Sequence, residues 1–185
     1  MTKTLEELTE LIIKWGAKKG IYDNSSYEYQ LNKTLEEVTE LHKAILDNDV
    51  EQIKDAIGDI YVTLVMAGQF ELNLRLAITR YIGENKHQEY QRLYDNGNYD
   101  IKEWTKEELA QSCFVWIHYC ALSGLYQKNQ DNIEEAEYYL EEIIERLIVI
   151  GLAHDLEFTD CVEHAYNIIS KRTGKMTNGQ FIKDE

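Results

Sequence analysis

The fold of this chain is decided by residues 60–67, which read Ile60-Tyr61-Val62-Thr63-Leu64-Val65-Met66-Ala67. The run is apolar on nearly every side, which predicts a helix buried within the protein rather than one lying on its surface. Asp59 stands at the entrance of this run, and an aspartate is costly to remove from water unless a positive group compensates it. The stretch therefore predicts a buried helix with a charged partner near its start.

The segment that precedes this helix has a different pattern. Its apolar residues recur at steps of three and four, which predicts an amphipathic helix with one face toward the core; they are Leu31, Leu35, Val38, Leu41 and Ile45. Only a few residues separate the two helices, so they are expected to lie antiparallel.

Capping signals extend the helical pattern to the rest of the chain. A Ser, Thr, Asp or Asn stands three residues before a Glu or Gln at Thr4, Ser25, Asp49, Thr105 and Asn132. The sequence contains no proline, and no stretch is typical of a β-sheet. We therefore predict an all-α fold, an antiparallel bundle of about seven helices near residues 5–18, 26–46, 50–71, 74–94, 105–127, 133–153 and 160–173.

A single domain covering residues 1–185 is expected from the length. The polar, glycine-bearing segment 95–100 divides it into halves, 1–94 and 101–185. Thr4, Glu7 and Trp15 recur at the same spacing as Thr105, Glu108 and Trp116. Two explanations stay open, a degenerate tandem duplication and chance recurrence of helical patterns. The acids of 133–153 are expected to face mostly solvent, and its apolar residues to pack against the first half.

The formal net charge of −15 disfavours nucleic acid and anionic membranes as partners. The N-terminal residues lack the apolar core of a secretory signal, so a cytoplasmic location is expected. Three cysteines cannot all pair within one chain, and we interpret Cys113, Cys120 and Cys161 as reduced core thiols.

Two neighbouring helices carry closely spaced acids. Glu37 and Glu40 lie three apart beside the apolar stripe, with Glu36 next to them, and Asp55 and Asp59 lie four apart on the following helix. Such acids are often only a solvated helix face. On antiparallel neighbours, however, they form an oxygen-only cluster that suits Mg²⁺ or Mn²⁺, whose usual partner is a phosphate-bearing substrate.

The pattern Glu36-Glu37-x-x-Glu40, followed by Gly58-Asp59, resembles the signature of the MazG-like all-α nucleoside triphosphate pyrophosphohydrolases. That signature ends in glutamate-x-x-aspartate, whereas here Ala56 stands three before Asp59 and Asp55 four before it. Residues 165–183 and the opening helix with Trp15 are similar to phage-type members. The resemblance covers residues 1–72 and about 146–183.

The resemblance implies Mg²⁺-dependent hydrolysis of a nucleoside triphosphate to the monophosphate and pyrophosphate, serving nucleotide-pool housecleaning, with Mn²⁺ able to substitute. It also implies a homo-oligomer, a dimer or a tetramer, in the cytoplasm, or in the host cytoplasm if the chain is phage-encoded. The metal ligands would be Glu37, Glu40, Asp55 and Asp59, and Glu36 would act on the attacking water. Candidate substrate-binding residues are Lys171, Arg172, Lys175, Trp15, Asn85 and Lys86.

Three alternatives limit this interpretation. The basic cluster at 171–175 also suits the negative end of a helix dipole. A non-enzymatic helical interaction module would need neither metal nor Asp59. An inactive member of the same fold would bind nucleotide without cleaving it.

Overall fold

The structure is a computed structural model that describes residues 3–70, 86–96 and 103–184. The described residues form eight helices and a two-stranded hairpin, in agreement with the predicted all-α bundle. In chain order these are α1 (Leu5–Lys18), α2 (Ile21–Asn24), α3 (Tyr27–Asp47), α4 (Val50–Ala67), α6 (Lys86–Asp95), α7 (Lys106–Lys128), α8 (Ile133–Ala153), α9 (Phe158–Ile169), β1 (Gly174–Thr177) and β2 (Gln180–Lys183).

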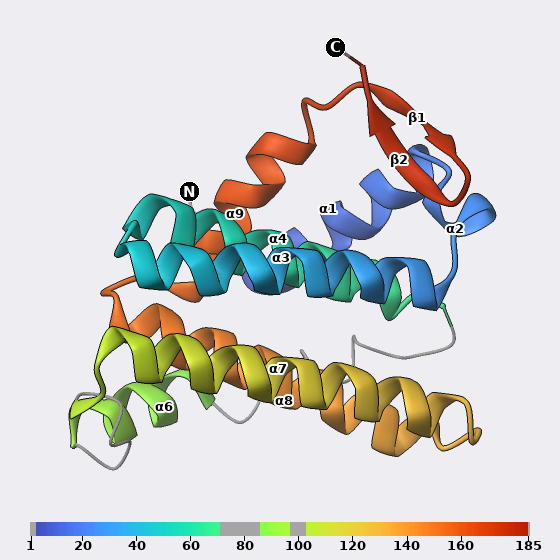
Figure 1. The fold of residues 1–185 in the computed structure, drawn as a ribbon. Coiled ribbons are helices and arrows are strands. Elements are labelled where there is room, and N and C mark those ends of the chain that lie inside the picture. The colour runs from blue at the N-terminus through green and yellow to red at the C-terminus, as the bar shows by residue number, and fades with distance from the viewer. Residues whose placement is uncertain (1–2, 71–85, 97–102, 185) are drawn as a thin grey trace.

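The helices are arranged in two layers (Figure 1). One layer contains α1, α3, α4 and α9, and the hairpin lies at its outer side; the other contains α6, α7 and α8. The layers meet where α3 packs on α7 and α4 packs on α8. The apolar residues of α8, including Leu140, Ile144 and Leu147, are fully or almost fully buried, as the sequence predicted. Glu137 of α8 is also buried, so the expectation of solvent-facing acids is wrong at that position.

The α3–α4 pair forms the centre of the first layer. The two-residue connection begins with Asn48 in the left-handed conformation, and the Asp49 side chain accepts a hydrogen bond from the backbone N–H of Gln52. The Thr34 hydroxyl donates to Thr63 Oγ1 at 2.9 Å, which links the two helices inside the core. As predicted from the sequence, residues 60–67 are buried, apart from the partly exposed Thr63.

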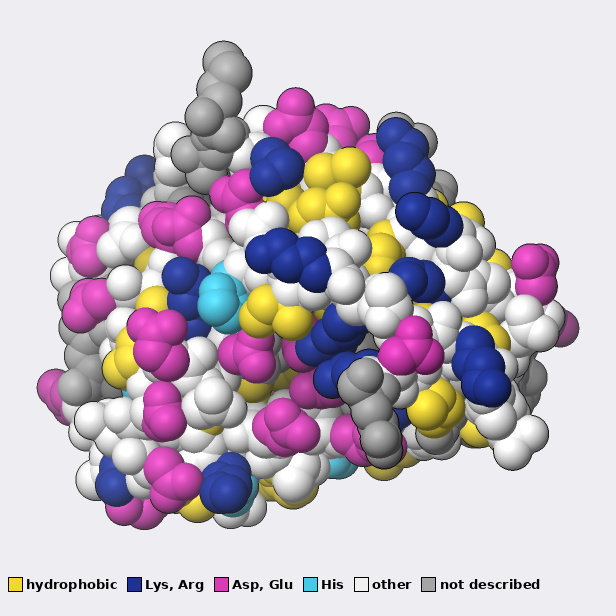
Figure 2. Space-filling model, turned by 90° about the horizontal axis from the view of Figure 1, so that it is seen from above, with side chains coloured by type: hydrophobic (Ala, Val, Ile, Leu, Met, Phe, Trp, Pro, Cys, Tyr) yellow, Lys and Arg dark blue, Asp and Glu magenta, His cyan; other side chains and the backbone are white. Residues whose placement is uncertain are grey.

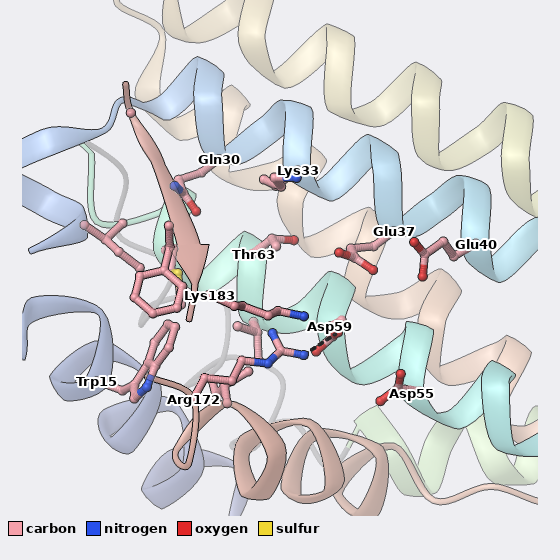
Figure 3. Close-up of a pocket in the computed structure, with 16 residues that line it drawn as sticks. Trp15, Gln30, Lys33, Glu37, Glu40, Asp55, Asp59, Thr63, Arg172 and Lys183 are labelled. Atoms are coloured by element: carbon pink, nitrogen blue, oxygen red, sulfur yellow. Dashed lines mark ion pairs between the residues drawn. The ribbon is translucent and has the colours of Figure 1, made fainter. Parts of the chain in front are cut away.

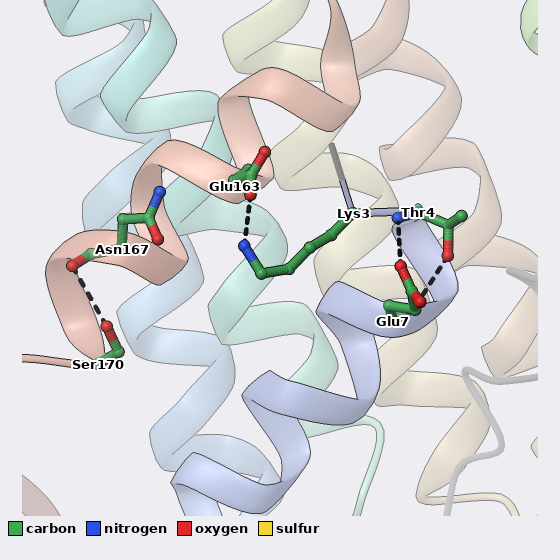
Figure 4. Close-up of polar contacts among 6 residues, drawn as sticks. All are labelled: Lys3, Thr4, Glu7, Glu163, Asn167 and Ser170. Atoms are coloured by element: carbon green, nitrogen blue, oxygen red, sulfur yellow. Dashed lines mark hydrogen bonds and ion pairs between the residues drawn. The ribbon is translucent and has the colours of Figure 1, made fainter. Parts of the chain in front are cut away.

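The first and last parts of the chain pack on α4. Thr9 of α1 shares a hydrogen bond of 2.8 Å with the buried Tyr61 hydroxyl of α4. Thr4 and Glu7 form the predicted capping box, and just before it Lys3 forms an ion pair with Glu163 of α9 (Figure 4). These contacts join α1 to α4 and to α9, and α9 itself packs on α4.

Several predicted boundaries need correction. The helix expected at 74–94 falls largely outside the described residues, and α6 begins at Lys86. α4 ends at Ala67 rather than 71, and α9 spans Phe158–Ile169 rather than 160–173. The short helix α2 was not predicted. The three cysteines are buried and free, as expected.

The prediction that no segment forms a β-sheet is wrong for residues 174–183. Gly174 pairs with Lys183 and Thr177 with Gln180 in an antiparallel hairpin. Its turn residues, Asn178 and Gly179, both have positive φ values, 50° and 81°. An Asn-Gly pair is the preferred sequence for a two-residue hairpin turn, so the signal was present. Four-residue strands are too short for apolar alternation to reveal them.

Candidate active site

A pocket of about 320 Å³ lies between α3, α4, the end of α9 and the C-terminal hairpin. α3 contributes four lining side chains at steps of three and four, so all of them lie on one face of that helix. α4 contributes a second such row. The lining residues are Trp15, Ile21, Gln30, Lys33, Glu37, Glu40, Asp55, Asp59, Val62, Thr63, Met66, Ile169, Arg172, Gly179, Phe181 and Lys183.

The four acids predicted as metal ligands all line this pocket. Glu37 and Glu40 come from α3, and Asp55 and Asp59 face them from α4 (Figure 3). One oxygen of Asp55, Oδ1, is buried and has no hydrogen-bond partner; the Nε2 atom of His164 lies 3.4 Å from it. Among the described residues, no three His, Cys, Asp or Glu side chains converge on one point as a ready metal cage.

Burial and mutual repulsion act on two of these acids. Burial raises the pKa of Glu37 to about 7, and the negative charges of Asp59 and Glu40 contribute to the rise. Burial likewise raises the pKa of Asp59 to about 6, with Asp55 adding to the shift. Both carboxylates are therefore harder to ionise than in water, and a cation bound beside them would favour their charged forms.

Basic side chains reach the same pocket from the C-terminal part of the chain. Arg172 follows α9, and its guanidinium lies 3.8 Å from the Asp59 carboxylate. Lys183 extends from β2 toward the same acid (Figure 3), and both cations act to lower the pKa of Asp59. On the face of the molecule that carries α9 and the hairpin, Lys and Arg side chains gather beside Asp and Glu side chains (Figure 2). Asp59 thus has the positive partner that its position required.

An aromatic wall closes the other end of the pocket. Trp15 and Phe181 meet edge to face, with ring centroids 5.6 Å apart. Lys19 fixes this corner, since its ammonium donates to the Arg172 carbonyl at 2.7 Å and lies 5.4 Å from the centre of the Phe181 ring. Gln30 donates its amide N–H to Ser25 Oγ, and its amide oxygen points toward the pocket (Figure 3).

The structure does not bring every predicted site residue to the pocket. Glu36 is exposed and pairs with Lys33, because the next residue along a helix points about 100° away from Glu37. Lys171 and Lys175 are exposed and do not line the pocket. Asn85 lies outside the described residues, as does the side chain of Lys86.

The structure adds lining residues that the sequence did not indicate. Lys183 and Phe181 lie on the hairpin that was not predicted, so only the Asn-Gly turn signal pointed toward them. Lys33 lies four residues before Glu37, and Gln30 lies three residues before Lys33. This spacing continues the pocket face of α3 toward the N-terminus of the helix. His164 of α9 is not a lining residue but contacts Asp55, and no sequence pattern connected those two positions.

Without divalent cations, the stability of the protein should depend on pH in a defined direction. Glu37 and Asp59 bind protons more tightly when folded, with pKa values of about 7 and 6 against ordinary values of 4.5 and 3.8. The stability that the folded state gains by binding these protons is fully present below about pH 4 and is lost as the pH rises toward 7. In the presence of a chelator, the free energy of unfolding of Glu37→Gln should fall less between pH 4.5 and 7.5 than that of the wild type. Urea denaturation at several pH values measures it. Parallel curves for the two proteins would contradict the shifted pKa.

Comparison with known proteins agrees with the motif-based resemblance. The family model of phosphoribosyl-ATP pyrophosphohydrolases matches residues 5–80, which include all four lining acids. An uncharacterized 18.2 kDa protein from the rep–hol intergenic region of Haemophilus phage HP1 is 32% identical over 62 residues, 34% of this chain and 38% of that protein. No solved structure matches. The resemblance to MazG-like pyrophosphohydrolases is thus confirmed for the first part of the chain.

Both matches are confined to a part of the chain. The aligned region spans about two fifths of the phage relative, and the family match ends before α6.

None of the described helices is long and apolar enough to cross a membrane.

Proposed function

We propose that the chain is a pyrophosphohydrolase that cleaves a nucleoside triphosphate between its α- and β-phosphates. Water adds across this anhydride bond, and the products are a nucleoside monophosphate and pyrophosphate. The observation that supports this most directly is the pocket itself, in which Glu37 and Asp59 of the acidic rows stand beside Arg172 and Lys183. The family match to residues 5–80 supports a hydrolase of this general kind.

The donor set of the pocket suits a hard divalent cation. Glu37, Glu40, Asp55 and Asp59 offer only oxygen, which Mg²⁺ and Mn²⁺ prefer, and the buried Asp55 Oδ1 atom accepts no hydrogen bond from the described residues, its nearest cationic group among them being His164 Nε2 at 3.4 Å. When bound, such an ion would neutralise phosphate charge and polarise the phosphorus that water attacks. Arg172 and Lys183 would hold the phosphate oxygens, since both cations already reach this end of the pocket.

The aromatic end of the pocket suits the nucleoside. Trp15 and Phe181 offer flat apolar surfaces, and the Gln30 amide oxygen is held ready as a hydrogen-bond acceptor. A nucleotide lying along the pocket would then place its base near Trp15 and its phosphates near Asp59. Glu36, exposed and paired with Lys33, remains a proposed base only if that pair opens.

The experiment that tests this function measures release of pyrophosphate from a panel of nucleoside triphosphates and phosphoribosyl-ATP. Mg²⁺, Mn²⁺ and chelator are compared in parallel. We expect turnover with at least one substrate and loss of turnover in chelator. Binding of nucleotide without turnover would instead support an inactive member of the fold, and neither binding nor turnover would support a helical interaction module.

Lys183→Met should raise the KM for the triphosphate by about tenfold, because one charge-assisted hydrogen bond to phosphate is lost. Lys175→Met is the matched control. It removes a lysine from the other strand of the same hairpin, where the side chain is exposed and does not line the pocket. Steady-state kinetics of both variants check the assignment, and equal KM values for the two would contradict it.

A further inference from the structure

Helix α7 has an unusual composition for this protein. From Leu109 to Gln127 it contains no Asp, Glu, Lys or Arg, although 29% of the residues in the whole chain are charged. One face of the helix accounts for part of this, since Cys113, Ile117 and Cys120 are buried in the core. The interior of the protein therefore explains the apolar residues of that face only.

The opposite face of α7 carries large apolar side chains that remain in solvent. Val115, Tyr119, Leu122 and Tyr126 are 55%, 52%, 55% and 63% exposed, and they follow one another at steps of four, three and four. That spacing places them in one row along the helix, which we name the α7 stripe. Single exposed apolar residues are common on the surfaces of soluble proteins, but a contiguous row of them indicates an interaction surface.

Neighbouring aromatic side chains widen the α7 stripe. Trp116 is 36% exposed, and its ring centroid lies 5.7 Å from that of Tyr119. From α8, Tyr138 is 48% exposed and packs edge to face against Tyr139, which in turn contacts Tyr119. Arg146 lies over the Trp116 ring at 5.6 Å, so this ring is already held in place. The surface is thus partly ordered before any partner arrives.

The absence of charge in the α7 stripe favours a second copy of the chain as the occupant of this surface. At a net charge of −15, two copies repel each other over most of their surfaces. The four side chains of the α7 stripe carry no charge, so they can meet their own copy without placing one charge against another, whereas the neighbouring Tyr138 of α8 has Glu142 beside it. Because the row consists of apolar and Tyr side chains alone, it is also complementary to itself across a two-fold axis.

The area of the surface agrees with this occupant. A large side chain that is half exposed offers on the order of 100 Å², so the α7 stripe with Trp116 and Tyr138 presents about 600 Å² per copy. Two copies would then bury about 1,200 Å² in total, the size of a small specific interface.

We propose that the α7 stripe is the contact through which two copies of this chain associate, with α7 against α7. The contact lies in the layer opposite the pocket (Figure 1), and the described pocket residues do not include any residue of the stripe. Association would therefore complete the burial of α7 without contributing a side chain to the proposed active site. This contact is independent of the proposed function.

Leu122→Glu tests the proposal by sedimentation velocity and by light scattering after gel filtration. Wild type is expected at twice its 21.7 kDa mass. A charge placed in the α7 stripe should raise the dissociation constant by about a hundredfold, so the variant should run as a monomer. Since Leu122 is more than half exposed, helicity and the melting of the monomer should change little. Ile168→Glu is the control, because it places the same charge at a partly exposed apolar position on α9.

Two results would overturn the proposal. A wild-type chain that stays monomeric at about 100 µM would show that the α7 stripe does not bind its own copy. An oligomer that survives Leu122→Glu would place the contact elsewhere, whether or not Ile168→Glu dissociates it. If Leu122→Glu fails to fold, Tyr126→Lys replaces it at the most exposed position of the row, with the same expected outcome.

Discussion

Asp59→Asn is expected to reduce pyrophosphate release by at least about 10²–10³-fold, the cost typical of removing one essential electrostatic group from an active site. The Asp59 side chain is 16% exposed, and the Arg172 guanidinium lies 3.8 Å from its carboxylate. The amide keeps the volume of the side chain but removes its charge, so a divalent cation would lose a ligand. Melting of the metal-free variant should stay close to wild type or rise, because repulsion with Asp55 disappears.

Asp160→Asn is the matched control for this variant. Asp160 is exposed on the first turn of α9 and does not line the pocket, so activity should be unchanged. Titration of the protein with Mg²⁺ in a calorimeter measures metal binding without relying on turnover. Asp59→Asn should bind Mg²⁺ more weakly than the wild type. Full turnover and unchanged Mg²⁺ binding in Asp59→Asn would remove Asp59 from the site.

Gly58→Ala is expected to lower the free energy of unfolding by about 3 kcal/mol, at the upper end of the usual cost of overpacking a core. A Cβ atom at Gly58 would lie 2.3 Å from the Cys161 carbonyl oxygen and 2.7 Å from Ala165 Cβ. Both neighbours belong to α9, and a carbonyl in a helix cannot move aside alone. The variant should push α9 away from α4 and carry Arg172, which follows α9, away from Asp59.

Gly124→Ala is the control for Gly58→Ala, because it adds the same methyl group within a helix but without the clash. At Gly124 the nearest atom to a new Cβ is Tyr139 Cβ at 3.4 Å, which is ordinary contact. The higher helix propensity of alanine should therefore leave Gly124→Ala as stable as wild type or more stable, by up to about 1 kcal/mol. Urea denaturation measures both variants. Equal stability of Gly58→Ala and wild type would contradict the close approach of α4 and α9.

The spacing of the pocket acids and the resemblance to the MazG-like motif together indicated them. Glu37 and Glu40 are separated by three positions and Asp55 and Asp59 by four, and a helix places such residues on one side whatever surrounds it. The short connection at Asn48 then leaves little choice but antiparallel packing, so the two rows meet. Glu36 was less predictable, because adjacent residues on a helix face different surroundings and only the packed structure decides which of them faces the pocket.

The sequence by itself determined the helical fold, the buried helix at 60–67 and the four facing acids, because these depend on local periodicity and capping, which act within a few residues. Only the tertiary structure decided that Lys183 and Phe181 complete the pocket, and that Arg172 reaches it whereas Lys171 and Lys175 do not, because more than one hundred residues of chain separate these positions from Asp59. No local rule reaches over that distance. Their positions follow from the packing of α9 at Gly58 and from the Asn178-Gly179 turn, which together return the end of the chain to the helices at its beginning.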